Sequence, residues 1–151
     1  MRRVGVDAGK HANAWVLLDE FAFVALGLCS GAIHSQVPEP DRVGLVAIEL
    51  PQIYRTGRQK GDPNDLIAVA AEAGKCSVGF SCPTRFYKPR DWKGTMSKSL
   101  SHSRIRDFYL TVDPSSLLRF FLALEQHPLR LRHNLWDALG VTSWAARKAL
   151  R

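Results

Sequence analysis

The chain opens on Arg2-Arg3-Val4-Gly5-Val6-Asp7-Ala8-Gly9, where apolar residues alternate with smaller or polar ones. This period of two predicts a β-strand that ends at Asp7. Small residues follow the carboxylate and leave room beside it for a ligand or a metal ion. The alternative is an ordinary turn aspartate at a strand end. The choice depends on whether other carboxylates converge on Asp7.

Three further segments near the N-terminus are expected to form strands. Residues 13–18 and 21–28 follow the first strand after short turns, so the three strands are expected to be antiparallel neighbours, because a parallel crossover needs about a dozen residues. Residues 43–49 are apolar on both faces, which is typical of a central strand covered by helices. This strand ends in a second carboxylate, Glu49, for which the alternative is an ordinary surface glutamate.

The rest of the chain is predicted to alternate between helix and strand. Asp62 and Pro63 are typical of a helix start, and Gly74 is expected to close that helix. A fifth strand is predicted over residues 78–87. Asp113 and Pro114 are expected to begin another helix, and the last helix is predicted over residues 131–150.

The last helix carries a third acid, Asp137. His133 and Asp137 are four residues apart and share one helix face, and Asn134 lies one turn before Asp137. Asp137 sits among apolar neighbours, where an unpaired carboxylate would be costly, so a partner is expected and a metal ion is one candidate. If the fourth strand pairs beside the first, Asp7 and Glu49 leave the same sheet edge. Such hard oxygen ligands suit Mg²⁺ or Mn²⁺, and two ions about 4 Å apart can drive phosphodiester hydrolysis.

The bulk composition favours a basic protein with a polyanionic partner. The 151 residues predict a single domain, 1–151, and the 21 Lys+Arg against 14 Asp+Glu give a net charge of +7. The stretch 88–106 concentrates cations and hydroxyls that suit phosphate contacts, although a solvated helix face would look the same. A basic protein without a nucleic-acid partner is the alternative for the whole chain.

The cysteines and the short apolar segments are typical of a cytoplasmic protein. Cys29, Cys76 and Cys82 form no CxxC pair, which is typical of reduced thiols in the cytoplasm. The most apolar segment, residues 21–28, is too short to cross a bilayer, so no membrane partner is expected.

Taken together, these motifs resemble the RuvC family of Holliday-junction resolvases within the RNase H-like superfamily. Residues 4–9 resemble the opening strand with its first metal-binding Asp, and residues 46–49 the strand that supplies the catalytic Glu. Residues 89–94, with Lys98 beyond, resemble the basic segment that contacts the junction. Residues 133–140 resemble the closing helix with the last metal ligand. The order and spacing cover nearly the whole chain.

The resemblance implies an α/β fold with an RNase H-like five-stranded mixed sheet of order 3-2-1-4-5 flanked by helices. It implies a homodimer that nicks four-way junctions or branched DNA and leaves 5′-phosphate and 3′-hydroxyl ends. The metal ligands, for two Mg²⁺ or Mn²⁺ ions, would be Asp7, Glu49, Asp137 and Asn134. The catalytic set would be Asp7, Glu49, Asp137, His133 and Lys98. The DNA contacts would be Lys10, Arg55, Arg58, Lys60, Lys88, Arg90, Trp92, Lys93, Lys98 and Arg104.

Two departures from the family pattern keep other functions open. Ala8 stands where the family usually has Pro, and Asn134 stands where many members carry another acid. One alternative is a nuclease for RNA or for other branched DNA, and another is a DNA-binding module that has lost its chemistry. A sugar-kinase or actin-like ATPase lobe also begins with such a strand, but it needs a second lobe for which 151 residues leave no room.

Overall fold

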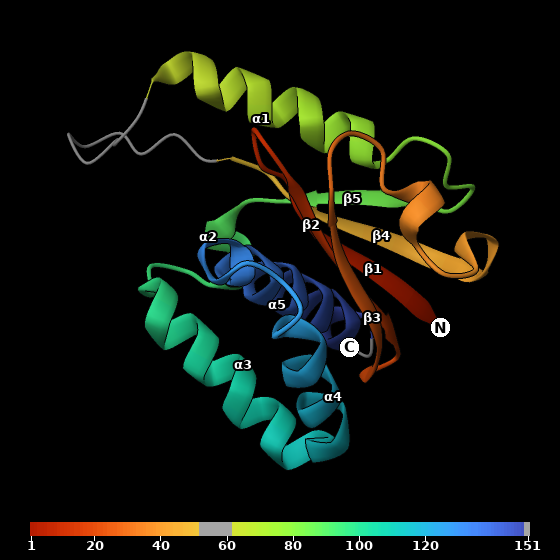
Figure 1. The fold of residues 1–151 in the computed structure, drawn as a ribbon, viewed down its shortest axis with the longest axis vertical. Helices are drawn as coiled ribbons and strands as arrows, with labels where there is room; N and C mark the ends of the chain where they lie inside the picture. Colours follow the sequence, from red (N-terminus) through yellow and green to blue (C-terminus); the bar gives the residue numbers. More distant parts are fainter. Residues whose placement is uncertain (52–61, 150–151) are drawn as a thin grey trace.

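The computed structural model describes residues 1–51 and 62–149, which form a five-stranded mixed sheet (Figure 1). Strand β1 pairs antiparallel with β2 and parallel with β4, which confirms the predicted order β3-β2-β1-β4-β5. Because β1 and β4 are parallel neighbours, their carboxyl ends meet at one sheet edge. The strands are β1 Arg2–Asp7, β2 Asn13–Asp19, β3 Ala22–Cys29, β4 Val43–Glu49 and β5 Thr84–Tyr87.

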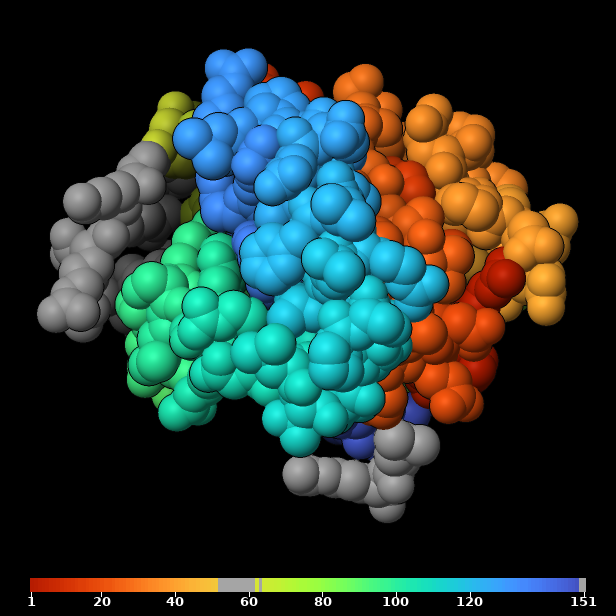
Figure 2. All heavy atoms as spheres, turned by 60° about the horizontal axis from the view of Figure 1, so that its bottom comes forward, coloured from red at the N-terminus to blue at the C-terminus, as the bar shows by residue number. Residues whose placement is uncertain are grey.

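Helices cover both faces of this sheet. One face carries the first helix, and the other carries the fourth and fifth helices, with the third packed outside them (Figure 1). Figure 2 looks onto this second side, where the third and fourth helices lie in front. Within 1–51 and 62–149, none of the helices is both long and apolar enough to cross a membrane. The helices are α1 Pro63–Cys76, α2 Pro89–Trp92, α3 Lys98–Val112, α4 Pro114–Leu124 and α5 Arg132–Lys148, with 3₁₀ turns at His34–Gln36, Pro40–Arg42 and Leu129–Leu131.

The alternation along β1 decides which side chains face which helix. Val4 and Val6 are fully buried in the cluster that contains Ala73 and Cys76 of α1. Successive strand residues point to opposite faces, so Gly5 and Asp7 lie on the α5 side. On β4, Val46 and Ile48 belong to the α1 side in the same way, whereas Ala47 packs with Val141 of α5. The same alternation directs Glu49 to the α5 side.

Gly5 lets α5 lie directly on the sheet. A side-chain carbon at this position would collide with the Thr142 hydroxyl and the Ala138 carbonyl oxygen of α5. The Thr142 hydroxyl is held toward this point because it donates to the same carbonyl oxygen within its helix. The absence of a side chain at residue 5 therefore fixes how near α5, and Asp137 with it, comes to the end of β1.

Two predicted boundaries are wrong. The fifth strand starts at Thr84 instead of residue 78, because Gly79 adopts φ +94° and Pro83 has no N–H to donate to a sheet ladder. The first helix begins as predicted, with the Asp62 side chain accepting from the Asn64 N–H, but it continues past Gly74 to Cys76. There Ser77 caps it, since both its N–H and its hydroxyl bond to the Gly74 carbonyl.

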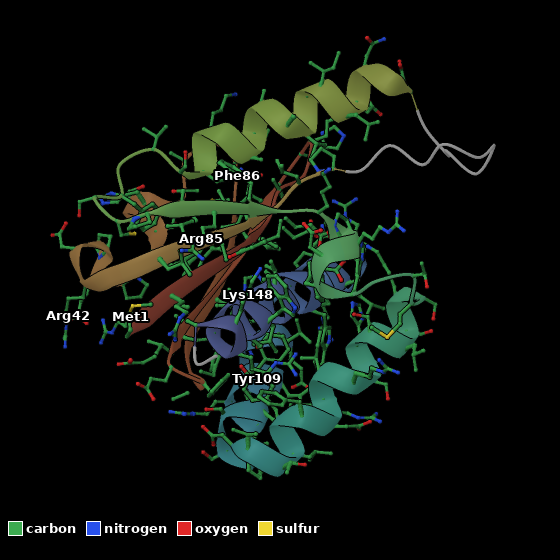
Figure 3. The ribbon with its side chains drawn as sticks, turned by 180° about the vertical axis from the view of Figure 1, so that it is seen from behind. Met1, Arg42, Arg85, Phe86, Tyr109 and Lys148 are labelled. Atoms are coloured by element: carbon green, nitrogen blue, oxygen red, sulfur yellow. The ribbon has the colours of Figure 1, made fainter. Side chains whose placement is uncertain are left out.

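The basic stretch 88–106 contains two helices that the predicted element order lacked. Helix α3 buries only Ser101, Ile105 and Tyr109, four residues apart, so its apolar stripe is too narrow to stand out in the sequence. Tyr109 reaches α5, where its hydroxyl lies 2.9 Å from the Ser143 hydroxyl (Figure 3). The segment is therefore a packed part of the fold with one solvent-facing side.

Replacing Gly5 by Ala should lower the free energy of unfolding by about 3 kcal/mol, because the added methyl group overpacks the contact between β1 and α5. Gly74→Ala is the matched control: its Cβ meets nothing within 4 Å in α1, so stability should rise by about 0.5–1 kcal/mol. Urea denaturation of both variants measures the difference. Equal stability of Gly5→Ala and the parent chain would contradict the close packing of α5.

Candidate functional site

The first two acids are brought together by strand pairing. Asp7 and Glu49 are the last residues of β1 and β4, and they are direct partners in the parallel register. Their side chains face α5, which carries Asp137. Asn13 fixes the turn that leads the chain away from Asp7, because its buried side-chain oxygen accepts from the Gly9 N–H at 3.1 Å. The three acids predicted from the sequence thus lie on one side of the sheet, at one edge.

Glu49 is held by two neighbours from the segment after β5. The Trp92 indole N–H donates to Glu49 Oε2 at 2.7 Å, and Lys93 Nζ donates to Oε1 and Oε2 at 3.2 and 3.3 Å. Glu49 is only 9% exposed. Burial raises the pKa of Glu49 above its ordinary value, although Lys93 and the indole N–H oppose that rise. The two neighbours keep the orientation of this carboxylate fixed.

Asp137 is surrounded by cationic and hydrogen-bonding groups. Its Oδ1 lies 3.1 Å from His102 Nε2 and 3.5 Å from Lys93 Nζ, and its Oδ2 lies 3.2 Å from Lys98 Nζ. Burial opposes ionisation of this almost fully buried group. The His102 hydrogen bond and the charges of Lys93 and Lys98 outweigh burial and lower the pKa of Asp137 to about 2. Asp137 is therefore a permanent anion at neutral pH.

Asp7 is the acid that these cations leave open. Among the described residues, no side chain forms a hydrogen bond or ion pair with its carboxylate. Burial, followed by repulsion from Glu49 and Asp137, raises the pKa of Asp7 well above its ordinary value. The three carboxylates are thus close enough to repel one another. The charges of Lys98 and Lys93 oppose this rise in pKa without overcoming it.

The three carboxylates, from β1, β4 and α5, offer the kind of oxygen ligands that a divalent cation such as Mg²⁺ or Mn²⁺ prefers. Lys98 and Lys93 act on Asp7 only through their charges, whereas they pair directly with the other two acids. As the side chains stand in residues 1–51 and 62–149, no three His, Cys, Asp or Glu are arranged closely enough to hold a metal ion. The Lys93 ammonium already lies between two of the acids. The acids therefore fit a divalent cation in the chemistry of their oxygens, and Asp7 is the one that no ammonium of the described residues pairs with directly.

The remaining residues predicted for catalysis lie at the rim. Lys98 is about half exposed and contacts Asp137. His133, one turn before Asp137 on α5, is exposed, and desolvation together with the Lys98 charge lowers its pKa. Asn134 is partly buried beside it. His133 is therefore neutral at pH 7 and open to solvent.

The residues predicted to contact DNA fall into three groups. Lys88, Arg90 and Arg104 are exposed on the α2–α3 segment that borders the acids, whereas Trp92 and Lys93 of this segment face Glu49. Lys10 pairs with Asp65 of α1 at 2.7 Å, on the rim of a cavity of about 290 Å³ that Gly9 and His11 also line. Arg55, Arg58 and Lys60 lie outside the described residues.

His102 was missed by the sequence prediction. It lies four residues after Lys98 on α3, so both side chains point at Asp137, and its ring stacks on Trp136 with centroids 5.7 Å apart. The signal was the Lys98–His102 spacing, which is informative only once the segment is known to be helical. The role of Trp92 as a donor to Glu49 had no such signal, because these residues are 43 positions apart.

Known proteins were compared with the chain by sequence and by structure. No family model matches, and no curated protein sequence matches. Solved structures do match, and two of them cover 99% of this chain and 96% of their own. They are the structure of Thermus thermophilus RuvC, with 13% identity and a TM-score of 0.61, and T. thermophilus RuvC in complex with a Holliday junction substrate, with 16% identity and a TM-score of 0.64. The fold is that of RuvC.

The RuvC fold confirms the RNase H-like architecture expected from the motifs. At 13–16% identity the likeness extends to the path of the chain and not to its chemistry. The same path can be followed by sequences with few residues in common because alternation, turns and register determine it. The activity must therefore be argued from the residues that this chain places at the RuvC-like sheet edge.

A double-mutant cycle tests the bond between Trp92 and Glu49. We expect Trp92→Phe and Glu49→Ala to couple by about 1.5 kcal/mol in the free energy of unfolding, because the indole N–H donates to a charged, buried acceptor. Urea denaturation of the two single variants and the double variant gives this coupling. Strictly additive effects would show that the indole does not hold the Glu49 carboxylate.

Proposed function

We propose that the chain is a metal-dependent endonuclease that cuts four-way junctions or similarly branched DNA. The observation that carries the proposal is the convergence of Asp7, Glu49 and Asp137, from β1, β4 and α5, at one edge of a RuvC-like sheet. The solved relative bound to a Holliday junction supports the choice of substrate. The net charge of +7 supports a polyanionic partner.

Different residues would bind the cation, stabilise the phosphate and accept the proton. A bound divalent cation would be held by Asp7 with Glu49 and Asp137, and it would supply a Lewis acid for the scissile phosphate. Lys98, half exposed beside Asp137, would add positive charge near that phosphate. His133, neutral at pH 7, would accept a proton from the attacking water at a ring nitrogen. The water oxygen forms the new bond to phosphorus as the bond to the 3′ oxygen breaks, leaving a 5′-phosphate and a 3′-hydroxyl.

Phosphate contacts would come from the exposed cations around this edge. Lys88, Arg90 and Arg104 project from the segment that also supplies Lys93 and Lys98 to the acids. One segment would thus bind the DNA backbone and orient the catalytic carboxylates. Binding carried by such cations falls steeply as salt is raised, because each contact releases counterions.

A two-fold dimer would suit a two-fold substrate. We propose that two copies of the chain place one site on each of two symmetry-related strands of the junction, as the family resemblance implies. Closed two-fold association is the commonest form of homo-oligomer, and it would make the two nicks equivalent.

One observation favours a second candidate, a DNA-binding module without chemistry. Lys93 and Lys98 already neutralise Asp137, and Lys93 also pairs with Glu49, so two of the three acids are compensated without a metal ion. In that case the acids would serve only to hold α2 and α3 against α5. The two candidates differ in cleavage, not in junction binding.

Asp7→Asn should keep junction affinity and lose cleavage by at least about 100-fold, because the open carboxylate that anchors the cation is gone. The assay follows strand cleavage of a synthetic four-way junction and a linear duplex of matched arm sequence, with Mg²⁺ and with EDTA. Gel-shift titration of the same junction measures binding.

Asp19→Asn is the matched control, since Asp19 also ends a strand but lies half exposed at the opposite edge of the sheet, paired with the N-terminal amine. It should cleave as the parent chain does. Undiminished cleavage by Asp7→Asn would exclude the proposed site. Junction binding by the parent chain without cleavage in Mg²⁺ or Mn²⁺ would establish the binding module instead. If the chain cleaved linear duplex or RNA as well as it cleaves the junction, branched DNA would not be its specific substrate.

A further inference from the structure

A lysine ammonium is built into the acid cluster. Lys93 Nζ lies 3.2 Å from Glu49 Oε1 and 3.5 Å from Asp137 Oδ1, so it bridges an acid of β4 and an acid of α5. The side chains of Lys93 and Glu49 are each only 10% exposed, and that of Asp137 is 1% exposed. A buried cation between two carboxylates occupies the kind of position in which a metal ion is otherwise held.

The backbone and the neighbouring ring keep Lys93 in place. Lys93 is the C-terminal cap of α2, where its N–H bonds to the Pro89 carbonyl oxygen at 2.9 Å. Gly94 follows with φ +63°, which turns the chain sharply away toward α3. The ammonium also lies 4.7 Å from the centre of the Trp92 ring, whose N–H holds Glu49. The backbone cap, the turn at Gly94 and the Trp92 ring together hold the Lys93 side chain in its buried position.

The charges of the cluster leave room for one divalent ion. Asp7, Glu49 and Asp137 contribute three negative charges when ionised, and Lys93 cancels one of them. A single divalent cation beside Asp7 is enough to offset the remaining negative charge, which Lys98 also reduces. A second divalent ion would bring two more positive charges next to a fixed ammonium, and repulsion at such short range in a buried site is strong. Lys98 Nζ, 3.2 Å from Asp137 Oδ2, adds a further positive charge to the cluster, so it strengthens the repulsion of a second ion.

We propose that the cluster binds one divalent cation per chain and that the Lys93 ammonium permanently takes the place of a second, between Glu49 and Asp137. This inference rests on the proposed metal-dependent function and departs from the two ions expected from the sequence. Lys93 is accordingly a positioning residue, which supplies fixed positive charge to two metal-facing carboxylates. It also stabilises the folded chain without metal, because its ammonium pairs with both Glu49 and Asp137.

Metal binding by the full chain, without DNA, tests the proposal. Mn²⁺ is titrated into the metal-free protein by isothermal titration calorimetry, and electron paramagnetic resonance counts the unbound Mn²⁺. The parent chain should bind one Mn²⁺. Lys93→Met, which keeps the length of the side chain and removes its charge, should bind two, or bind its first ion at least about tenfold more tightly. Lys93→Arg should behave as the parent does.

Stability provides the second readout. In EDTA, thermal unfolding of Lys93→Met should occur below that of the parent chain, and Mn²⁺ should raise it by more than it raises the parent. Lys75→Met is the matched control: Lys75 also pairs with a glutamate, Glu72, at 2.6 Å, but on the exposed end of α1. It should change neither the number of ions nor the response to metal. If Lys93→Met does not fold in EDTA, refolding in Mn²⁺ gives the same comparison.

The outcomes separate this inference from the proposed function. Two ions in the parent chain, or one ion of equal affinity in the parent and Lys93→Met, would overturn the role of Lys93 and leave the nuclease intact. No ion in the parent but binding by Lys93→Met would overturn both, because Lys93 would then exclude metal altogether. No ion in either variant would overturn both as well, and would favour the DNA-binding module.

Discussion

The parallel pairing of β1 with β4 is the constraint on which the site depends. It sets Asp7 directly beside Glu49, and α5 adds Asp137 from the same side of the sheet. Three carboxylates meet at a buried edge, where burial and then repulsion from Glu49 and Asp137 raise the pKa of Asp7. A fold that collects negative charge in this way requires positive charge from elsewhere in the chain.

The segment after β5 meets this requirement. Helix α2 and its C-terminal cap supply the indole N–H of Trp92 and the ammonium of Lys93, and α3 supplies Lys98 and His102 from one face. The acids therefore organise two helices whose own apolar faces are small. The outer side of the same segment is basic and exposed, so DNA contact there would act on the part of the chain that orients the carboxylates.

Short turns predicted that β1, β2 and β3 are antiparallel neighbours, and alternation and an apolar run predicted Asp7 and Glu49 as carboxylates at strand ends. The full strand order was implied by the resemblance to the RuvC family, and Asp137 was indicated by its apolar neighbours in the last helix. Sequence alone could not show that Lys93 turns inward, since a lysine in a basic stretch looks the same whether it faces phosphate or a buried acid. Its position depends on Glu49 and Asp137, each more than 40 residues away. Helix α3 and His102 were missed because a helix with a narrow apolar stripe has little periodic signal.

Anomalous diffraction from crystals of the protein soaked in Mn²⁺ tests the central claim most directly, because it locates the ion and the lysine in one experiment. The account predicts one anomalous peak per chain, bound by Asp7, with the Lys93 nitrogen still lying between Glu49 and Asp137. Two peaks with Lys93 turned away, or no peak within reach of Asp7, would contradict it.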